Sequence, residues 1–275
     1  MRFFFVFAAY AAALRGGPVK RVRLAVRPAG AAPASSVSTE RPREVDRNVA
    51  LEAARRQHYA ARVLEGAPER VERVPGDAAA RRRYARDGVC VLENFFDAAL
   101  FGELEASAAA TVARLKPETM ESVAVGRWGC FLEPGDAVVA ALACERTVER
   151  LRYVVGDARL EAADYPVEMR RYPVGSAMGW HRDEALYEEP QIECVFTLAN
   201  SSDSETQWEN ADGSLERKWM PPNSLLVVKA EGAAHGVTPV TEGDRLIAKY
   251  VLSASRVKLQ AWYDNLDSYR EAPQP

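Results

Sequence analysis

The second half of the chain alternates short apolar segments with turn signals. After Val154, four stretches have the length and composition of single strands, and they span residues 168–172, 193–198, 224–229 and 246–252. Glycine, proline, asparagine and aspartate mark turns between them. No segment of helical length separates the strands, which argues against a parallel α/β sheet. The pattern therefore predicts an antiparallel β-sandwich or barrel for this half.

Helical spacing dominates the region before these strands. Apolar residues recur at helical intervals in residues 44–65 and again from Phe95 to Leu115. Asp77 is expected to be the N-cap of another helix, which Gly88 ends before a short buried strand. Helices first and strands second predict an α+β chain, with a β core and N-terminal helices packed outside it.

Length and composition exclude several classes of protein. The chain has 275 residues, of which 48% are hydrophobic and 27% charged, as expected for a globular protein and not for a collagen, a coiled coil or a disordered chain. Its net charge of −3 argues against nucleic acid as a partner, because such binding depends on a basic surface. The longest apolar run is about 12 residues, so no membrane span is expected.

The first 39 residues differ from the remainder of the chain. They contain six basic residues and no acidic residue. A short apolar run after a positive start is typical of a signal peptide, and the Arg-, Ser- and Ala-rich tract after it is typical of a transit peptide. We predict a targeting presequence in residues 1–39, leading to an organelle (plastid or mitochondrion) or to the endoplasmic reticulum and secretory pathway.

The predicted domains follow from these boundaries. A helical extension and linker is expected in residues 40–75, and a single domain with the strand-rich core in residues 76–255. Residues 256–275 are expected to form a C-terminal packing helix and a tail. The four cysteines have no CxxC spacing and are expected to be free thiols.

The candidate chemistry lies in two of the three histidines. His181 and Asp183 are two residues apart, which places both side chains on one side of an extended strand. His235 follows 52 residues after Asp183, where a β-barrel can return the chain opposite an earlier strand. Two histidines and one carboxylate form the facial triad of non-haem Fe(II) oxygenases, which leaves coordination positions open. The third histidine, His58, lies in a basic helical segment and is expected to be solvated or capping.

A basic residue follows the second histidine at a fixed distance. Arg245 lies ten residues after His235 and begins a predicted strand. A guanidinium group can bind a carboxylate with two parallel hydrogen bonds. Arg245 is therefore a candidate partner for a carboxylate that lies deeper in the barrel than the metal.

These motifs resemble a known family. Residues 171–183 contain Tyr-x-x-Gly before His-x-Asp, and residues 235–245 contain His-Gly-Val-x-Pro-Val before a basic residue. In this respect the chain resembles the Fe(II)/2-oxoglutarate-dependent dioxygenases, most closely their prolyl-hydroxylase-like branch. The resemblance covers about residues 80–255. It implies a double-stranded β-helix, or jelly-roll, with iron at its mouth.

The resemblance also implies roles for individual residues. His181, Asp183 and His235 match the iron ligands and are the expected catalytic residues. Arg245 matches the residue that binds the distal carboxylate of 2-oxoglutarate, and Thr197 lies where the superfamily often has a hydroxyl partner for that carboxylate.

Two further positions relate the chain to particular branches. Tyr172 matches the tyrosine that opens the motif and often lines the co-substrate pocket. Met178 replaces a tyrosine that is common in prolyl hydroxylases, so the motif does not by itself imply a prolyl substrate. Lys249 lies where a second arginine would be expected in the nucleic-acid dealkylases.

The implied reaction is hydroxylation of a C–H bond with release of succinate and CO2. It requires Fe(II), 2-oxoglutarate and O2, with ascorbate expected as reductant, and the substrate is a peptide, prolyl residues among them, or a small molecule. Related halogenases have a small residue in place of Asp183, so its carboxylate favours hydroxylation. The alternative is a cupin-like metal-binding protein without oxygenase activity, although cupins usually bring more histidines to the metal. No oligomeric state is predicted.

Overall fold

The computed structural model describes residues 74–118, 123–189 and 191–270, with the side chains of residues 267–270 excepted. All of these residues belong to one compact unit. The presequence predicted in residues 1–39, the helix predicted in residues 44–65 and His58 lie outside the described residues. The division into domains and the targeting therefore stay predictions.

Two antiparallel sheets form the core of the described chain. The larger sheet has the strand order β1-β11-β8-β13-β6-β4-β2, with β5 paired to β13, and the smaller sheet has the order β10-β9-β12-β7-β3. The strands of the larger sheet are β1 (Val89–Leu92), β2 (Lys116–Pro117), β4 (Trp128–Phe131), β5 (Glu161–Ala162), β6 (Glu168–Tyr172), β8 (Gln191–Asn200), β11 (Ser224–Lys229) and β13 (Arg245–Ser253). Those of the smaller sheet are β3 (Ala124–Val125), β7 (Ala177–His181), β9 (Thr206–Glu209), β10 (Leu215–Lys218) and β12 (His235–Val237).

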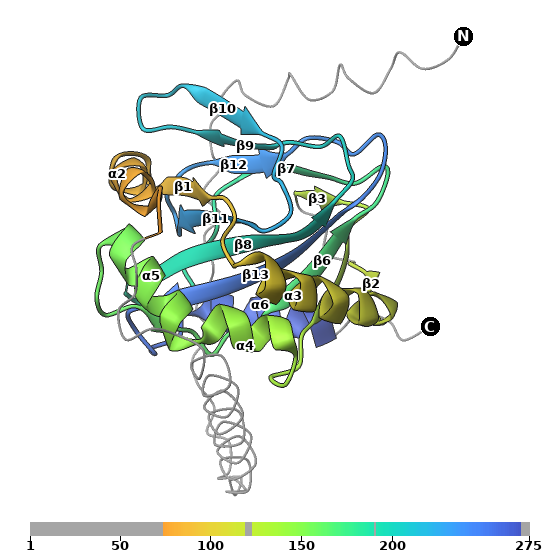
Figure 1. Cartoon of the computed structure of the whole chain (residues 1–275), viewed down its shortest axis with the longest axis horizontal. Helices are drawn as coiled ribbons and strands as arrows, with labels where there is room; N and C mark the ends of the chain where they lie inside the picture. The colour runs from red at the N-terminus through yellow and green to blue at the C-terminus, as the bar shows by residue number, and fades with distance from the viewer. Residues whose placement is uncertain (1–73, 119–122, 190, 271–275) are drawn as a thin grey trace, which may run out of the picture. The chain divides into compact units, whose positions relative to one another are not determined.

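From β6 onward the chain passes repeatedly from one sheet to the other. Strands β6, β8, β11 and β13 belong to the larger sheet, whereas β7, β9, β10 and β12 belong to the smaller sheet. Figure 1 shows the smaller sheet next to the long strands β8 and β13. This alternation is the jelly-roll arrangement, and the predicted fold class is confirmed. By strand pairing the sheets are two open layers and do not close into a barrel.

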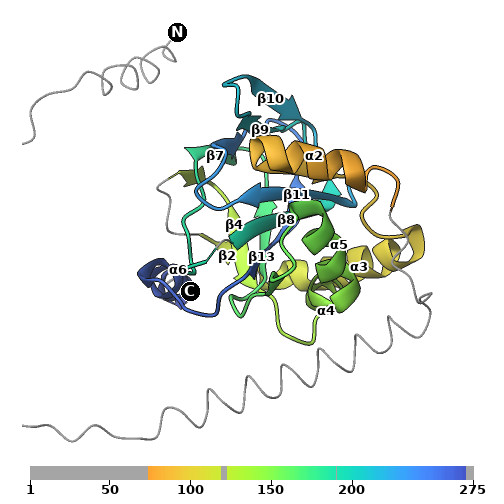
Figure 2. The same cartoon turned by 90° about the vertical axis from the view of Figure 1, so that its left-hand side faces the viewer.

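Helices from the N-terminal part cover the outer face of the larger sheet. They are α2 (Asp77–Asp87), α3 (Ala98–Thr111), α4 (Ala137–Ala143) and α5 (Glu145–Val155), and Figure 2 shows α3, α4 and α5 on one side of β8 and β13. Leu104 and Leu151 of these helices belong to the same buried cluster as Phe196 of β8. Because side chains alternate along a strand, Glu193, Val195 and Thr197 point to the opposite face, toward the smaller sheet.

The start of α2 differs from the prediction. Gly76 is the N-cap, and Asp77 is the first helical residue and caps nothing. The Asp77 carboxylate instead forms a buried ion pair with Arg150 of α5, with 2.8 Å between Oδ1 and Nη2. Arg150 also donates to the carbonyl of Phe95 at 2.6 Å. The aspartate therefore joins α2 to α5 through tertiary structure, which the local sequence did not reveal.

A C-terminal helix, α6 (Gln260–Arg270), packs beside the core. Trp262 donates from Nε1 to the Tyr187 hydroxyl at 3.0 Å and makes an edge contact with the Tyr165 ring. This packing brings Asp264 and Asn265 to the wall of a cavity described below. No helix in the described ranges is long and apolar enough to cross a membrane. The four cysteines are free thiols, as predicted.

Candidate metal and active site

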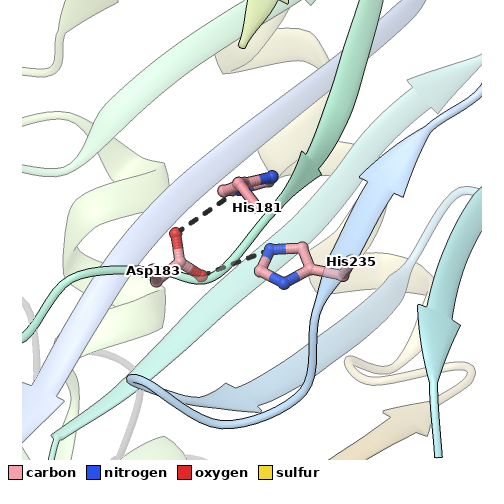
Figure 3. Close-up of side chains that lie close together, drawn as sticks. All are labelled: His181, Asp183 and His235. Carbon is pink, nitrogen blue, oxygen red and sulfur yellow. Dashed lines mark ion pairs between the residues drawn. The ribbon is translucent and has the colours of Figure 1, made fainter. Parts of the chain in front are cut away.

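His181, Asp183 and His235 come together between the two sheets, as Figure 3 shows. His181 ends β7 and His235 begins β12, and the two residues are register partners in adjacent strands. The Nε2 atoms of His235 and His181 lie 3.3 and 3.8 Å from the Asp183 carboxylate oxygens. One possible ligand atom from each residue lies within 4.8 Å of the others, and among the described residues this is the one such group.

Asp183 reaches this group in a different way from that predicted. It lies in the loop two residues beyond the end of β7, so strand alternation does not place it beside His181. The backbone amide of Glu231 donates to the carbonyl of Asp183 at 2.8 Å. This bond ties the loop that carries Asp183 to the segment that leads into β12 and His235.

A β-bulge helps to set the direction of the His181 side chain. On β12, His235 pairs with His181 but Val237 pairs with Met178. Four residues of β7 therefore lie opposite three residues of β12, so β7 contains one extra residue. Both Met178 and His181 consequently line the same cavity. A Cβ atom on Gly236 would lie 2.7 Å from the carbonyl oxygen of Met178. Glycine at position 236 thus permits the close approach of the two strands at the site.

The hydrogen bonds of the imidazoles direct one nitrogen of each ring to the group. His181 Nδ1 lies 3.0 Å from the carbonyl oxygen of Gly179, and His235 Nδ1 lies 3.2 Å from that of Ala233. A carbonyl only accepts, so each Nδ1 is assigned as the donor and each Nε2 keeps a lone pair. His181 Nε2 is buried and has no hydrogen-bond partner among the described residues.

The protonation of the group favours metal binding. Burial, with the nearby His235, lowers the pKa of His181 to about 4. Burial alone would raise the pKa of Asp183, but Lys249 and the two histidines hold it well below its usual value. A neutral imidazole and an ionised carboxylate are the forms that bind a metal ion. The two imidazole nitrogens and the carboxylate oxygen therefore fit a divalent transition metal such as Fe(II).

Lys249 is the closest charged neighbour of this group. Its ammonium group lies 3.0 Å from Asp183 Oδ1 and 3.3 Å from Glu193 Oε2. Burial lowers the pKa of Lys249, but these two carboxylates raise it above its usual value overall. Burial also raises the pKa of Glu193 to about 7. In the sequence, Lys249 stands out only as a departure from the nucleic-acid dealkylase pattern, although its place four residues after Arg245 puts both residues on one strand face.

Arg245 is a buried cation that faces no carboxylate of the described residues at ion-pair distance. Its side chain is 2% exposed and donates from Nη1 to the Thr206 hydroxyl at 2.8 Å, whereas Nε has no hydrogen-bond partner in the part of the chain that the structure describes. Among the described residues it has no ion pair. Burial lowers the pKa of Arg245 to about 10, so the group stays charged at neutral pH. A buried charge normally has a charged partner, and the unbonded Nε is a position for one from outside the chain.

Tyr172 and Thr197 lie in the same interior. Tyr172 is the register partner of Arg245 on the neighbouring strand β6. Thr197 on β8 is the register partner of Ile247, and its buried hydroxyl has no hydrogen-bond partner within the described ranges. Sequence reasoning did not identify Thr206, the hydroxyl that bonds to Arg245, because nothing in its turn-rich segment distinguishes it. The roles assigned to these residues stay predictions.

A cavity of about 650 Å³ opens beside the metal-binding group. His181 and Asp183 line it, but Arg245 does not. Met178 lies between the two regions, since it lines the cavity and its sulfur is 3.6 Å from the Tyr172 hydroxyl. A methionine side chain can change shape at low cost. The residue that departs from the prolyl-hydroxylase pattern therefore separates the cavity from the interior around Arg245.

Comparisons with known proteins give matches among solved structures. A prolyl-4-hydroxylase from Pseudomonas putida is 21% identical, with a TM-score of 0.54 over 65% of this chain and 99% of that chain. An oxidoreductase of the 2OG-Fe(II) oxygenase family from Burkholderia pseudomallei is 16% identical, with a TM-score of 0.58 over 68% and 95%. A prolyl hydroxylase from Trichoplax adhaerens, in complex with a hypoxia-inducible-factor peptide, is 11% identical, with a TM-score of 0.54 over 86% and 99%.

No protein-family model matches the chain, and no curated protein matches it. At these low identities the structural matches establish the fold. The chain has the fold of the 2-oxoglutarate/Fe(II) oxygenases, prolyl hydroxylases among them, and the resemblance predicted from its motifs is confirmed at that level.

Proposed function

We propose that the protein is an Fe(II)- and 2-oxoglutarate-dependent dioxygenase that hydroxylates a C–H bond. One oxygen atom of O2 enters the substrate as a hydroxyl group, and the other enters succinate as 2-oxoglutarate loses CO2. The observation that carries the proposal is the buried Arg245, which has no ion pair among the described residues and shares the interior with a His-Asp-His group. The substrate is a peptide, prolyl residues among them, or a small molecule.

The spacing between these groups suits 2-oxoglutarate. Arg245 bonds to Thr206, which pairs with Val237 on β12, two residues beyond His235. Two residues of a strand span roughly 7 Å. A five-carbon dicarboxylate held at one end near the histidines can place its other carboxylate near Arg245. Thr197 would add a hydrogen bond there, since its buried hydroxyl has no partner within the described chain.

Different residues of the chain would hold the iron and the 2-oxoglutarate. His181, Asp183 and His235 would hold the ion, and Arg245 would bind and orient the distal carboxylate of 2-oxoglutarate. Bound Fe(II) supplies the redox chemistry that couples oxidation of 2-oxoglutarate to oxidation of the substrate. Asp183 occupies the position that a halide would need, which favours hydroxylation over halogenation. Ascorbate is proposed as the reductant that keeps the iron in the Fe(II) state.

A cupin-like metal-binding protein without oxygenase activity would need the metal ligands but not Arg245. The experiment therefore measures both sites in the full-length protein without O2. We expect one Mn(II) ion to bind per chain, and 2-oxoglutarate to bind only after Mn(II). His181→Ala and His235→Ala should lose Mn(II) binding, whereas His58→Ala should retain it.

Activity is measured separately as succinate release with Fe(II), O2 and ascorbate. Binding of Mn(II) without binding of 2-oxoglutarate would favour the cupin-like alternative. Loss of Mn(II) in His58→Ala, with its retention in His235→Ala, would refute the assignment of the ligands.

A further inference from the structure

The cavity wall beside the metal-binding group carries buried charges of both signs. Besides Asp183, six charged side chains of the wall are at least four-fifths buried. Three of them are acids and three are bases. They are Glu118, Glu168, Glu193, Arg127, Arg170 and Lys249. Their exposed fractions run from 2% for Glu193 to 19% for Lys249. The wall is therefore charged but close to neutral as a whole.

One part of the wall is a chain of ion pairs. Arg127 Nε donates to Glu118 Oε2 at 2.6 Å, and Arg170 Nε lies 3.5 Å from the other oxygen of Glu118. Arg170 also donates from Nη2 to Glu168 Oε1 at 3.0 Å. A Cβ atom on Gly129 would collide with the Glu118 carboxylate, so glycine in β4 makes room for it. Acids and bases thus alternate along this side of the cavity.

The other part of the wall joins these charges to the metal-binding group. Lys249 pairs with Glu193 and with Asp183, as described above. Lys249 is the register partner of Glu168 in the neighbouring strand β6. The two parts therefore meet on the inner face of the larger sheet, next to the position at which a substrate would be oxidised.

Such a wall disfavours an apolar occupant. Removing water from a buried ion costs several kcal/mol unless other polar groups replace the water. A prolyl ring in a polypeptide, or a hydrocarbon, would displace water and return few hydrogen bonds. A polar ligand suits such a wall better, because a carboxylate can accept about four hydrogen bonds and a guanidinium group can donate five.

We infer that the substrate is a small zwitterion of the free amino acid class, an inference that rests on the proposed oxygenase function. The ammonium group of the zwitterion would contact the carboxylates of Glu168 and Glu193. Its carboxylate would contact the guanidinium groups of Arg170 and Arg127. A polyanion or a polycation would instead meet three like charges in the wall. The carbon skeleton of the zwitterion has apolar surface to lie on, which Phe131, Tyr165, Met178 and Leu186 contribute.

The test uses calorimetric titration of the full-length protein loaded with Mn(II) and 2-oxoglutarate, without O2. The probes are the standard free L-amino acids and, as matched controls, their N-acetyl amides, which lack both charges. We expect at least one free amino acid to bind, and its N-acetyl amide to bind at least tenfold more weakly. Absence of binding by every free amino acid would overturn the inference, as would equal binding of the blocked forms.

Variants of the wall give a second measurement. Glu168→Gln keeps the size of the side chain and should weaken the binding amino acid at least tenfold, with the affinities for Mn(II) and 2-oxoglutarate unchanged. Arg170→Met should act in the same way. Arg171→Met is the control, since this neighbour on β6 is 41% exposed and pairs with Asp244 at the surface. Unchanged amino acid affinity in both wall variants would overturn the assignment of the wall.

Failure of the inference can be distinguished from failure of the proposed function. If Mn(II) and 2-oxoglutarate bind but no amino acid does, the substrate class is wrong and the oxygenase proposal stands. If 2-oxoglutarate does not bind, the oxygenase proposal fails and the substrate inference fails with it.

Discussion

The uncompensated charge of Arg245 should destabilise the protein when 2-oxoglutarate is absent. Burial lowers the pKa of Arg245 well below its usual value, to about 10. One pKa unit corresponds to ~1.4 kcal/mol, so holding the charged form inside costs on the order of 3 kcal/mol of folding free energy. Below pH 10 the group is protonated in both the folded and unfolded states. The full cost is therefore present at neutral pH and is relieved only as the pH rises above about 10, toward the usual pKa of an arginine.

Replacing Arg245 with methionine should separate stability from binding. The variant removes the charge and also the hydrogen bond to Thr206, which is worth ~1 kcal/mol. We expect the ligand-free protein to become more stable by about 2 kcal/mol, and its melting temperature to rise by roughly 4–8 °C. The affinity for 2-oxoglutarate should fall by about 2–5 kcal/mol, or roughly 30- to 4,000-fold, because its carboxylate loses a buried partner. Arg245→Lys should recover part of this loss, since a point charge replaces some of the guanidinium contacts.

The assay combines thermal unfolding of the ligand-free protein with titration of 2-oxoglutarate into the Mn(II)-loaded protein without O2. In saturating 2-oxoglutarate the order of stabilities should reverse, because the wild type binds the ligand more tightly and gains more stability from it. Arg171→Met is the control, and it should change neither quantity appreciably because its arginine is half-exposed. Wild-type affinity for 2-oxoglutarate in Arg245→Met would refute the assigned role. A ligand-free variant less stable than the wild type would refute the reasoning about the buried charge.

Three further predictions concern the strands around the site, its charged neighbours and the N-terminus. Gly236→Ala should destabilise the fold by ~1–3 kcal/mol and weaken Mn(II) binding, because a Cβ there would lie 2.7 Å from a backbone oxygen of β7. In the same unfolding and titration measurements the control Gly102→Ala should be neutral or stabilising, because its Cβ would meet no described atom within 4 Å. Lys249→Met should lower the free energy of unfolding by about 3–5 kcal/mol, because it leaves buried carboxylates unpaired. Adding Glu193→Gln should restore part of that free energy in a double-mutant cycle measured by denaturant unfolding, and strict additivity of the two changes would contradict the pairing. A fluorescent fusion to residues 1–43 should leave the cytosol in microscopy, and a diffuse cytosolic signal would contradict the targeting prediction.

Local sequence features were sufficient to predict the main strands of the larger sheet and the residues of the candidate metal-binding group, but not the short strands of the smaller sheet. Strand length, period-two alternation and turn residues are local properties, so the strand that contains Thr197 and the one that begins at Arg245 could be placed without a structure. The spacing of His181 and Asp183, and the scarcity of histidine, identified the group. The prediction that both lie on one strand was wrong, because Asp183 lies in a loop whose path depends on a hydrogen bond to Glu231.

Only the tertiary structure decided which charges surround that group. Glu118, Arg170, Glu193 and Lys249 come from strands or segments far apart in the sequence, and each alone looks like an ordinary polar residue of a strand or loop. Their proximity depends on the order and register of the strands in the larger sheet, which the spacing of residues along one strand does not encode. The sequence by itself therefore determined which residues form the candidate metal-binding group, whereas the packing of the two sheets determined the charged cavity beside them.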